Sequence, residues 1–117
     1  SIVSQAKITR EQVRAKNKES LQEIIDNKQL TGEQKKKAVN EMVELTKIAE
    51  KEAAAETMLS AKGFTDSVVS LSEESADVVV NAKELSEANR AQIEDIVIRK
   101  TGMAAENIVI TPAGSKK

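Results

Sequence analysis

Three short runs of β-branched residues constrain the fold of this chain more than any other feature. They are Ser67 to Leu71 (SVVSL), Asp77 to Asn81 (DVVVN) and Asn107 to Thr111 (NIVIT). Branched side chains pack well in strands and lose conformational freedom in helices. The rest of the chain is rich in helix formers, so only the stretch from Phe64 to Thr111 can make a sheet, in the order strand, strand, helix, strand.

The valine pattern assigns the two faces of the predicted sheet. Side chains alternate between faces along a strand. We expect one face to form the core, with Val69, Leu71, Val78, Val80, Ile108 and Ile110. Each strand also sends one valine to the second face, namely Val68, Val79 and Val109. An apolar spot on that face needs a cover or a partner. The order of the strands stays open, because the third strand can pair at either side of the hairpin.

Two helices are predicted before the sheet. The first runs over residues 4–28 and has few apolar residues, which share one side at helical spacing: Val13, Leu21, Ile24 and Ile25. We therefore expect its C-terminal half to pack and its N-terminal half to be a solvated stalk. Thr31 and Gln34 form a capping box that starts the second helix, and Gly63 stops it.

The second helix is too long for a compact domain of this size. Its span of about 46 Å compares with an expected radius of gyration of about 13 Å. Either one end overhangs or the first helix folds back along it. If it folds back, the first helix is also a candidate cover for the second sheet face, in place of a partner.

A third helix runs from its cap, Ser86, to Gly102 and buries a stripe that includes Ile93 and Val97. Ile98 falls on its other side, where it packs under the Met103 loop or meets a partner. The chain thus divides into an N-terminal helix or stalk (1–30), an α+β domain (31–112) and a flexible tail (113–117). Because it opens Ser-Ile-Val without an initiator Met, we expect a fragment or a processed form.

The composition argues against catalysis. The chain has no Cys and no His, the residues that most often serve as metal ligands, nucleophiles and general bases. Glu73, Glu74 and Asp77 are the densest carboxylate cluster, but they lack the ligand spacing of a calcium loop. Glu73, Glu74 and Lys83 are the only plausible catalytic groups. We predict no enzyme activity, no catalytic residues, no cofactor and no metal.

Charge gives no general attraction to nucleic acid, since the net charge is −1. Residues 1–18 are locally basic, with five Lys or Arg and one Glu, which we interpret as a solvated helix face. The order of elements is compatible with a KH-like RNA-binding module as an alternative. That module needs a Gly-x-x-Gly loop, and the four glycines, Gly32, Gly63, Gly102 and Gly114, are nowhere spaced that way.

The order helix, strand, strand, helix, strand also describes the ring-building motif. One long segment resembles the extracytoplasmic domain of the stage III sporulation protein AH family. It begins at Thr31 (TGEQKKKAVNEMVELTKIAEKEAAAETMLSAKGF) and continues through DSVVSLSEESADVVVNAKELSEANRAQIEDIVIRKTGMAAENIVITP. The resemblance extends over nearly the whole chain, including the first helix. It implies an α+β fold, a three-stranded sheet packed on helices with an additional N-terminal helix. Similar modules occur in type III secretion and flagellar inner-membrane rings.

The resemblance further implies a partner and a location. Members are anchored in the mother-cell membrane by a helix that precedes this segment, and their soluble domain lies between the mother-cell and forespore membranes. There the domain binds the extracytoplasmic domain of stage II sporulation protein Q. It is also expected to self-associate into a ring and to meet other stage III A-operon proteins, in a channel complex that acts in engulfment and late forespore gene expression.

We therefore predict a non-enzymatic assembly domain that makes protein contacts. Its predicted interface residues are Val68, Val79, Val109 and Ile98. Burying three valines contributes roughly 4 to 5 kcal/mol, whereas association costs about 4 to 15 kcal/mol. This spot alone cannot hold a tight complex, so further contacts or many tethered copies are required.

Overall fold

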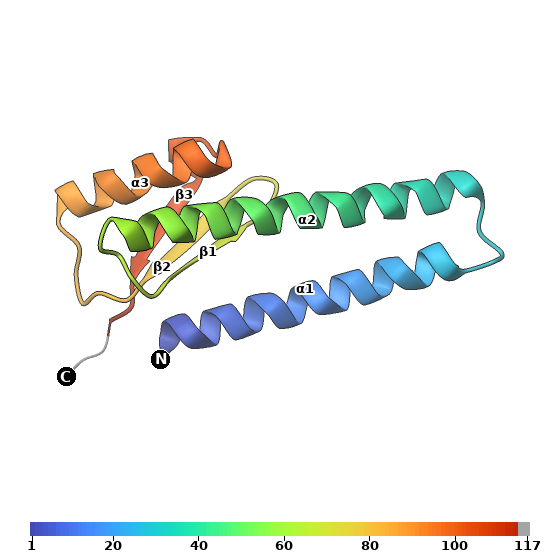
Figure 1. Cartoon of the computed structure of the whole chain (residues 1–117), viewed down its shortest axis with the longest axis horizontal. Helices are drawn as coiled ribbons and strands as arrows, with labels where there is room; N and C mark the ends of the chain where they lie inside the picture. Colours follow the sequence, from blue (N-terminus) through green and yellow to red (C-terminus); the bar gives the residue numbers. More distant parts are fainter. Residues whose placement is uncertain (115–117) are drawn as a thin grey trace.

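The computed structural model describes residues 1–114 as three helices and a three-stranded sheet (Figure 1). The elements, in chain order, are α1 (Ile2–Asp26), α2 (Gly32–Ala61), β1 (Ser67–Leu71), β2 (Ala76–Val80), α3 (Glu87–Thr101), the short 3-10 helix η1 (Ala105–Asn107) and β3 (Ile108–Pro112). The α+β prediction is confirmed, with β2 and β3 displaced by one residue from their predicted bounds. No helix among these residues combines the length and hydrophobicity that crossing a bilayer requires.

The ends of the helices follow from local capping. The Thr31 hydroxyl accepts the Gln34 N–H at 3.2 Å, and the Gln34 side chain accepts the Thr31 N–H at 2.9 Å, so the predicted capping box is present. The Ser86 hydroxyl accepts the Asn89 N–H at 3.0 Å and begins α3. Gly102 ends α3 at φ +79°, a left-handed conformation that side-chain-bearing residues rarely adopt.

The sheet has the order β1-β2-β3. β1 and β2 form an antiparallel hairpin, in which Val68 is opposite Val79. β3 pairs with β2 in parallel, as a strand that returns after the α3 crossover can, and Val109 is opposite Asp77. The open question of strand order is thus resolved with β2 in the centre.

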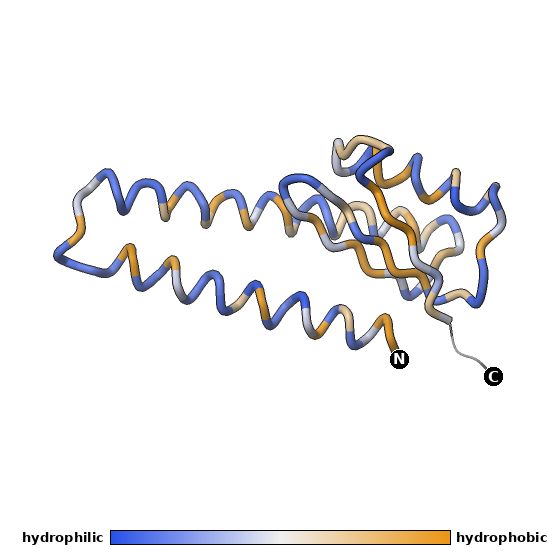
Figure 2. Tube along the Cα trace, turned by 180° about the vertical axis from the view of Figure 1, so that it is seen from behind, coloured by the Kyte–Doolittle hydropathy of each residue, from blue (hydrophilic) through white to orange (hydrophobic). Residues whose placement is uncertain are grey.

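The core lies between one face of the sheet and the two helices α2 and α3. Its buried residues are Ala55, Leu59, Val69, Ala76, Val78, Val80, Ile93, Ile96 and Val97, with Leu71, Ile108 and Ile110 partly buried beside them. The predicted core face is therefore confirmed. In Figure 2 the apolar residues gather on the strands, whereas polar and apolar residues alternate along the two long helices.

Helix α1 folds back along α2, so the two helices form a long hairpin (Figure 1). The far end of the hairpin projects beyond the sheet, which makes the molecule 55 Å long and 28 Å wide. Leu21 and Ala38 are buried in the projecting part. Both predicted ways of accommodating the long helix are therefore present: the first helix folds back, and one end overhangs.

The predicted solvated stalk is wrong. Val3 is only 2% exposed, and the side chains of Arg10 and Arg14 are mostly buried. The reverse holds for Val13 and Ile24, which were expected to pack and are 55% and 37% exposed. The apolar pattern misled because two arginines and the single buried Val3, rather than a stripe of apolar residues, dock the N-terminal half of α1.

The end of the chain is held to the sheet through residue 114. The Ala113 N–H donates to the Val80 carbonyl at 2.8 Å, and the Gly114 N–H donates to the Ala82 carbonyl at 2.9 Å. A Cβ added at Gly114 would lie 2.5 Å from the Ala82 carbonyl carbon, so the close approach requires glycine. The rest of the predicted flexible tail, residues 115–117, lies outside the described part of the chain.

Candidate interaction surfaces

A cluster of two glutamates and two arginines joins α1, α2 and β1. Glu52 and Glu56 lie one turn apart on α2, and Arg10 and Arg14 lie one turn apart on α1. Arg14 binds Glu52 through two hydrogen bonds, Nη1 to Oε1 at 2.7 Å and Nη2 to Oε2 at 2.9 Å. Arg10 Nη1 donates to Glu56 Oε2 at 2.7 Å. The earlier arginine of α1 thus pairs with the later glutamate of α2, and the later arginine with the earlier glutamate. Two antiparallel helices produce this order of pairs.

The same glutamates bind the outer edge of β1. Glu56 Oε2 accepts the Val69 N–H at 2.8 Å, and Glu52 Oε2 accepts the Leu71 N–H at 2.9 Å. The Val69 carbonyl accepts from Arg10 Nη1 at 2.7 Å. An edge strand normally leaves these groups available to another strand. Here side chains occupy the Val69 N–H and carbonyl and the Leu71 N–H, so β1 offers few main-chain groups to an added strand.

Burial and charge act in opposite directions on the two arginines. Burial by itself lowers the pKa of Arg10, but the hydrogen bond that Arg10 donates to Glu56 and the charges of Glu56 and Glu52 outweigh it, so the pKa is raised above its usual value. The hydrogen bond with Glu52 raises the pKa of Arg14, against a smaller effect of burial. Stability that depends on a raised arginine pKa is fully present below the ordinary arginine pKa and is lost only as the pH rises through the raised one, so both arginines stay charged at ordinary pH.

Sequence reasoning missed this cluster. The expectation of a solvated basic face is wrong for Arg10 and Arg14, and Glu52 is only 1% exposed. A usable signal was present: two basic residues four apart on one helix and two acidic residues four apart on the next. That pattern matches charges across a helical hairpin and did not enter a search for apolar stripes.

The second face of the sheet is covered at one side only. Helix α1 contacts β1 and β2. Val68 is 1% exposed although it points away from the core, so α1 is its cover. Val79 is half-buried, and Val109 on β3 is 54% exposed. The second sheet face was expected either to be covered by the first helix or to stay open for a partner. The helix covers its β1 side, and its β3 side stays open.

The remaining residues that the sequence singled out as candidate interface or catalytic groups do not lie on the second face of the sheet. Ile98 is half-buried on α3. Glu73, Glu74 and Lys83 are all exposed, the two glutamates in the β1–β2 hairpin loop and Lys83 between β2 and α3. Across residues 1–114 the structure contains no group of three or more His, Cys, Asp or Glu side chains placed to hold a metal ion.

The outer edge of β3 is partly occupied as well. The Ala113 N–H points at β2, so by alternation along the strand the main-chain groups of Ile110 point outward. Arg90 Nη1 on α3 donates to the Ile110 carbonyl at 3.3 Å. Pro112, next outward, has no N–H to offer. Both edges of the sheet therefore present few main-chain groups to a partner.

Comparison with known families decides where the chain belongs. The model of the SpoIIIAH-like protein family matches residues 1–110. The chain belongs to this family. The match covers α1 as well as the α+β domain, and so it includes the helix that the arginine–glutamate cluster docks onto the sheet.

A solved structure shares the fold. One chain of a structure described as the SpoIIQ–SpoIIIAH pore-forming complex superposes with a TM-score of 0.85 at 22% sequence identity, covering 98% of this chain and 99% of that one. No curated protein matches the chain in sequence. The family resemblance and the ring-building-motif architecture expected from sequence are confirmed.

Replacing Glu52 with Gln tests the cluster. The change leaves Arg14 next to a neutral group in a buried place, and loss of one partner of a buried ion pair is strongly destabilising. We expect the free energy of unfolding to fall by about 3 kcal/mol, measured by urea denaturation. The matched control is Glu50→Gln on the exposed side of α2, with a change within about 0.5 kcal/mol. Equal effects of the two changes would show that the cluster does not hold α1.

Proposed function

We propose that this chain is a non-enzymatic assembly domain of a sporulation complex, and that it binds the extracytoplasmic domain of SpoIIQ. The observation that carries the proposal is the match to the SpoIIIAH-like family over residues 1–110. The fold it shares with a chain from the SpoIIQ–SpoIIIAH complex supports it. The residue types present support it too, because the chain offers no His or Cys for catalysis.

The proposal includes self-association into a ring through the open part of the second sheet face. Val109 is the exposed residue there, and Val79 lies half-buried on the same face. One half-exposed valine contributes about 1 kcal/mol at most when it is covered. Each contact between copies is then weak, and a ring forms where tethering to a membrane raises the local concentration.

The proposal also includes a location in the space between the mother-cell and forespore membranes, with an anchoring helix before residue 1. Contacts with other stage III A-operon proteins and a role in engulfment and in a channel belong to the same proposal. The beginning of α1 lies beside the sheet, and the hairpin turn lies at the opposite end (Figure 1). An anchor there would hold the sheet near the mother-cell membrane and direct the hairpin tip away from it.

The partner is tested by mixing this domain with the SpoIIQ extracytoplasmic domain of the same organism. We expect both proteins to move to one earlier peak on a sizing column at micromolar concentrations. Separate elution of the two proteins at their individual volumes would contradict the proposal.

Self-association is tested with Val109→Glu. The side chain is already 54% exposed, so the fold should tolerate the change, whereas a carboxylate in a contact between copies would oppose it. We expect the sedimentation coefficient of the wild-type domain to rise weakly with concentration, and that of the Val109→Glu variant to stay constant. Val43→Glu is the control, because Val43 is 49% exposed on α2, away from the sheet face. Loss of self-association in both variants, or in neither, would count against a contact at the sheet.

A further inference from the structure

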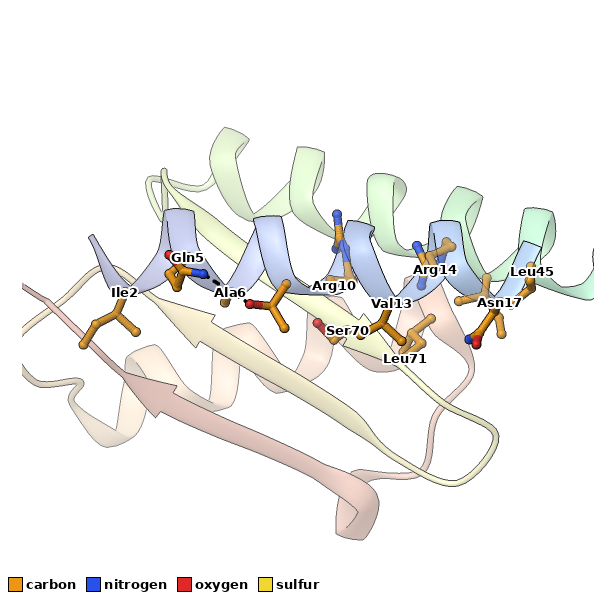
Figure 3. A pocket seen from close by; sticks show the side chains of 12 residues that line it. Ile2, Gln5, Ala6, Arg10, Val13, Arg14, Asn17, Leu45, Ser70 and Leu71 are labelled. Carbon is orange, nitrogen blue, oxygen red and sulfur yellow. Dashed lines mark hydrogen bonds between the residues drawn. The ribbon is translucent and has the colours of Figure 1, made fainter. Parts of the chain in front are cut away.

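An apolar groove runs along α1, on the side that faces β1. It has a volume of about 640 Å³, and it contains exposed apolar residues from α1 as well as partly buried ones from α2 and β1. Its lining includes Ile2, Val13, Leu45, Ile48 and Leu71. Figure 3 shows Ile2 and Val13 on the side of α1 nearest the strands, with Arg10 and Arg14 directed toward α2.

Three of the four large apolar residues that α1 leaves exposed lie on one side of the helix. Ile2, Val13 and Ile24 are spaced eleven residues apart, which is close to three helical turns. They are 61%, 55% and 37% exposed. Residues at this spacing share a side of a helix, and two of them, Ile2 and Val13, line the groove. Exposed apolar residues that line one groove are typical of a contact surface.

The cations that line the groove are paired with glutamates, whereas the carboxylates near its far end are not paired within residues 1–114. Its two cations, Arg10 and Arg14, are bound to Glu56 and Glu52. At its far end the groove continues into a second hollow, which shares Asn17, Leu45 and Ile48 with it.

This second hollow adds Glu41, Glu44 and Glu73. Within residues 1–114 none of these three carboxylates has a Lys or Arg nitrogen within 4.0 Å, since all the ion pairs of that part of the chain involve other acids. The groove therefore combines an apolar floor with a negative end.

We propose that this groove receives a segment of the partner protein, with apolar side chains over Val13 and Leu71 and with Lys or Arg over Glu41, Glu44 and Glu73. The inference rests on the proposed function and specifies the surface of this chain that the partner meets. The segment is held by side chains, because the main-chain groups of β1 beside the groove are already bound by Glu52, Glu56 and Arg10. Basic residues complement the negative end and give the contact its salt dependence.

The apolar part is tested with Val13→Glu, using Ile8→Glu as the matched control. Both residues lie on α1 and are about equally exposed, at 55% and 51%, but Ile8 lies outside the groove, beside Lys7 and Glu11. We expect Val13→Glu to weaken binding to the SpoIIQ extracytoplasmic domain at least about tenfold by calorimetry, the effect of losing one buried valine. Ile8→Glu should change it less than about twofold. Unchanged melting temperatures confirm that both variants fold.

The negative end is tested independently with Glu44→Lys, against Glu50→Lys on the other side of α2. Only the Glu44 variant should lose affinity, and its loss should shrink at high salt. If the Val13→Glu and Glu44→Lys variants both bind SpoIIQ with the affinity of the wild type, the groove is not the binding site, whereas the proposed function still holds. Wild-type protein that does not bind SpoIIQ overturns both. Loss of self-association alone in Val13→Glu makes a second copy the occupant and overturns the inference.

Discussion

The arrangement of this molecule depends on two carboxylates, Glu52 and Glu56, that each bind in two directions. Toward the sheet they accept the N–H groups of Leu71 and Val69, and toward α1 they bind Arg14 and Arg10. A buried carboxylate is costly unless it is paired and hydrogen-bonded, and these are both. The pairs fix which residues of the two long helices face each other. They also place α1 over β1, which decides how much of the second sheet face is covered.

Closing the β1 edge has a consequence for recognition. Sheets often bind partners by adding a strand, with main-chain hydrogen bonds supplying the affinity. In this chain the outer groups of β1 are bound by side chains, and Arg90 and Pro112 limit what β3 can offer. Contacts are left to side-chain surfaces: the open β3 side of the sheet and the groove along α1. Because the apolar area at each of these surfaces is small, each contact alone is expected to be weak.

Much of the fold could be predicted from sequence, because it is encoded locally. Alternation of valines identified the core face, and the caps at Thr31, Ser86 and Gly102 located the helix ends. The position of α1 could not be predicted in the same way. Arg10 and Arg14 bind partners that lie 46 and 38 residues away in the sequence. The spacing of apolar residues does not predict ion pairs over such separations. For the same reason Val68 and Val109, equivalent in the sequence pattern, differ in exposure from 1% to 54%.

Hydrogen exchange at the outer edge of β1 tests the central claim most directly. If Glu56 and Glu52 hold the edge, the amides of Val69 and Leu71 are protected as strongly as the Val78 amide in the central strand, since opening them requires β1 to separate from α2. Such protection in residues with no neighbouring strand on that side is what the arrangement predicts. Exchange of these two amides at the rate of unstructured chain, while Val78 remains protected, would contradict it.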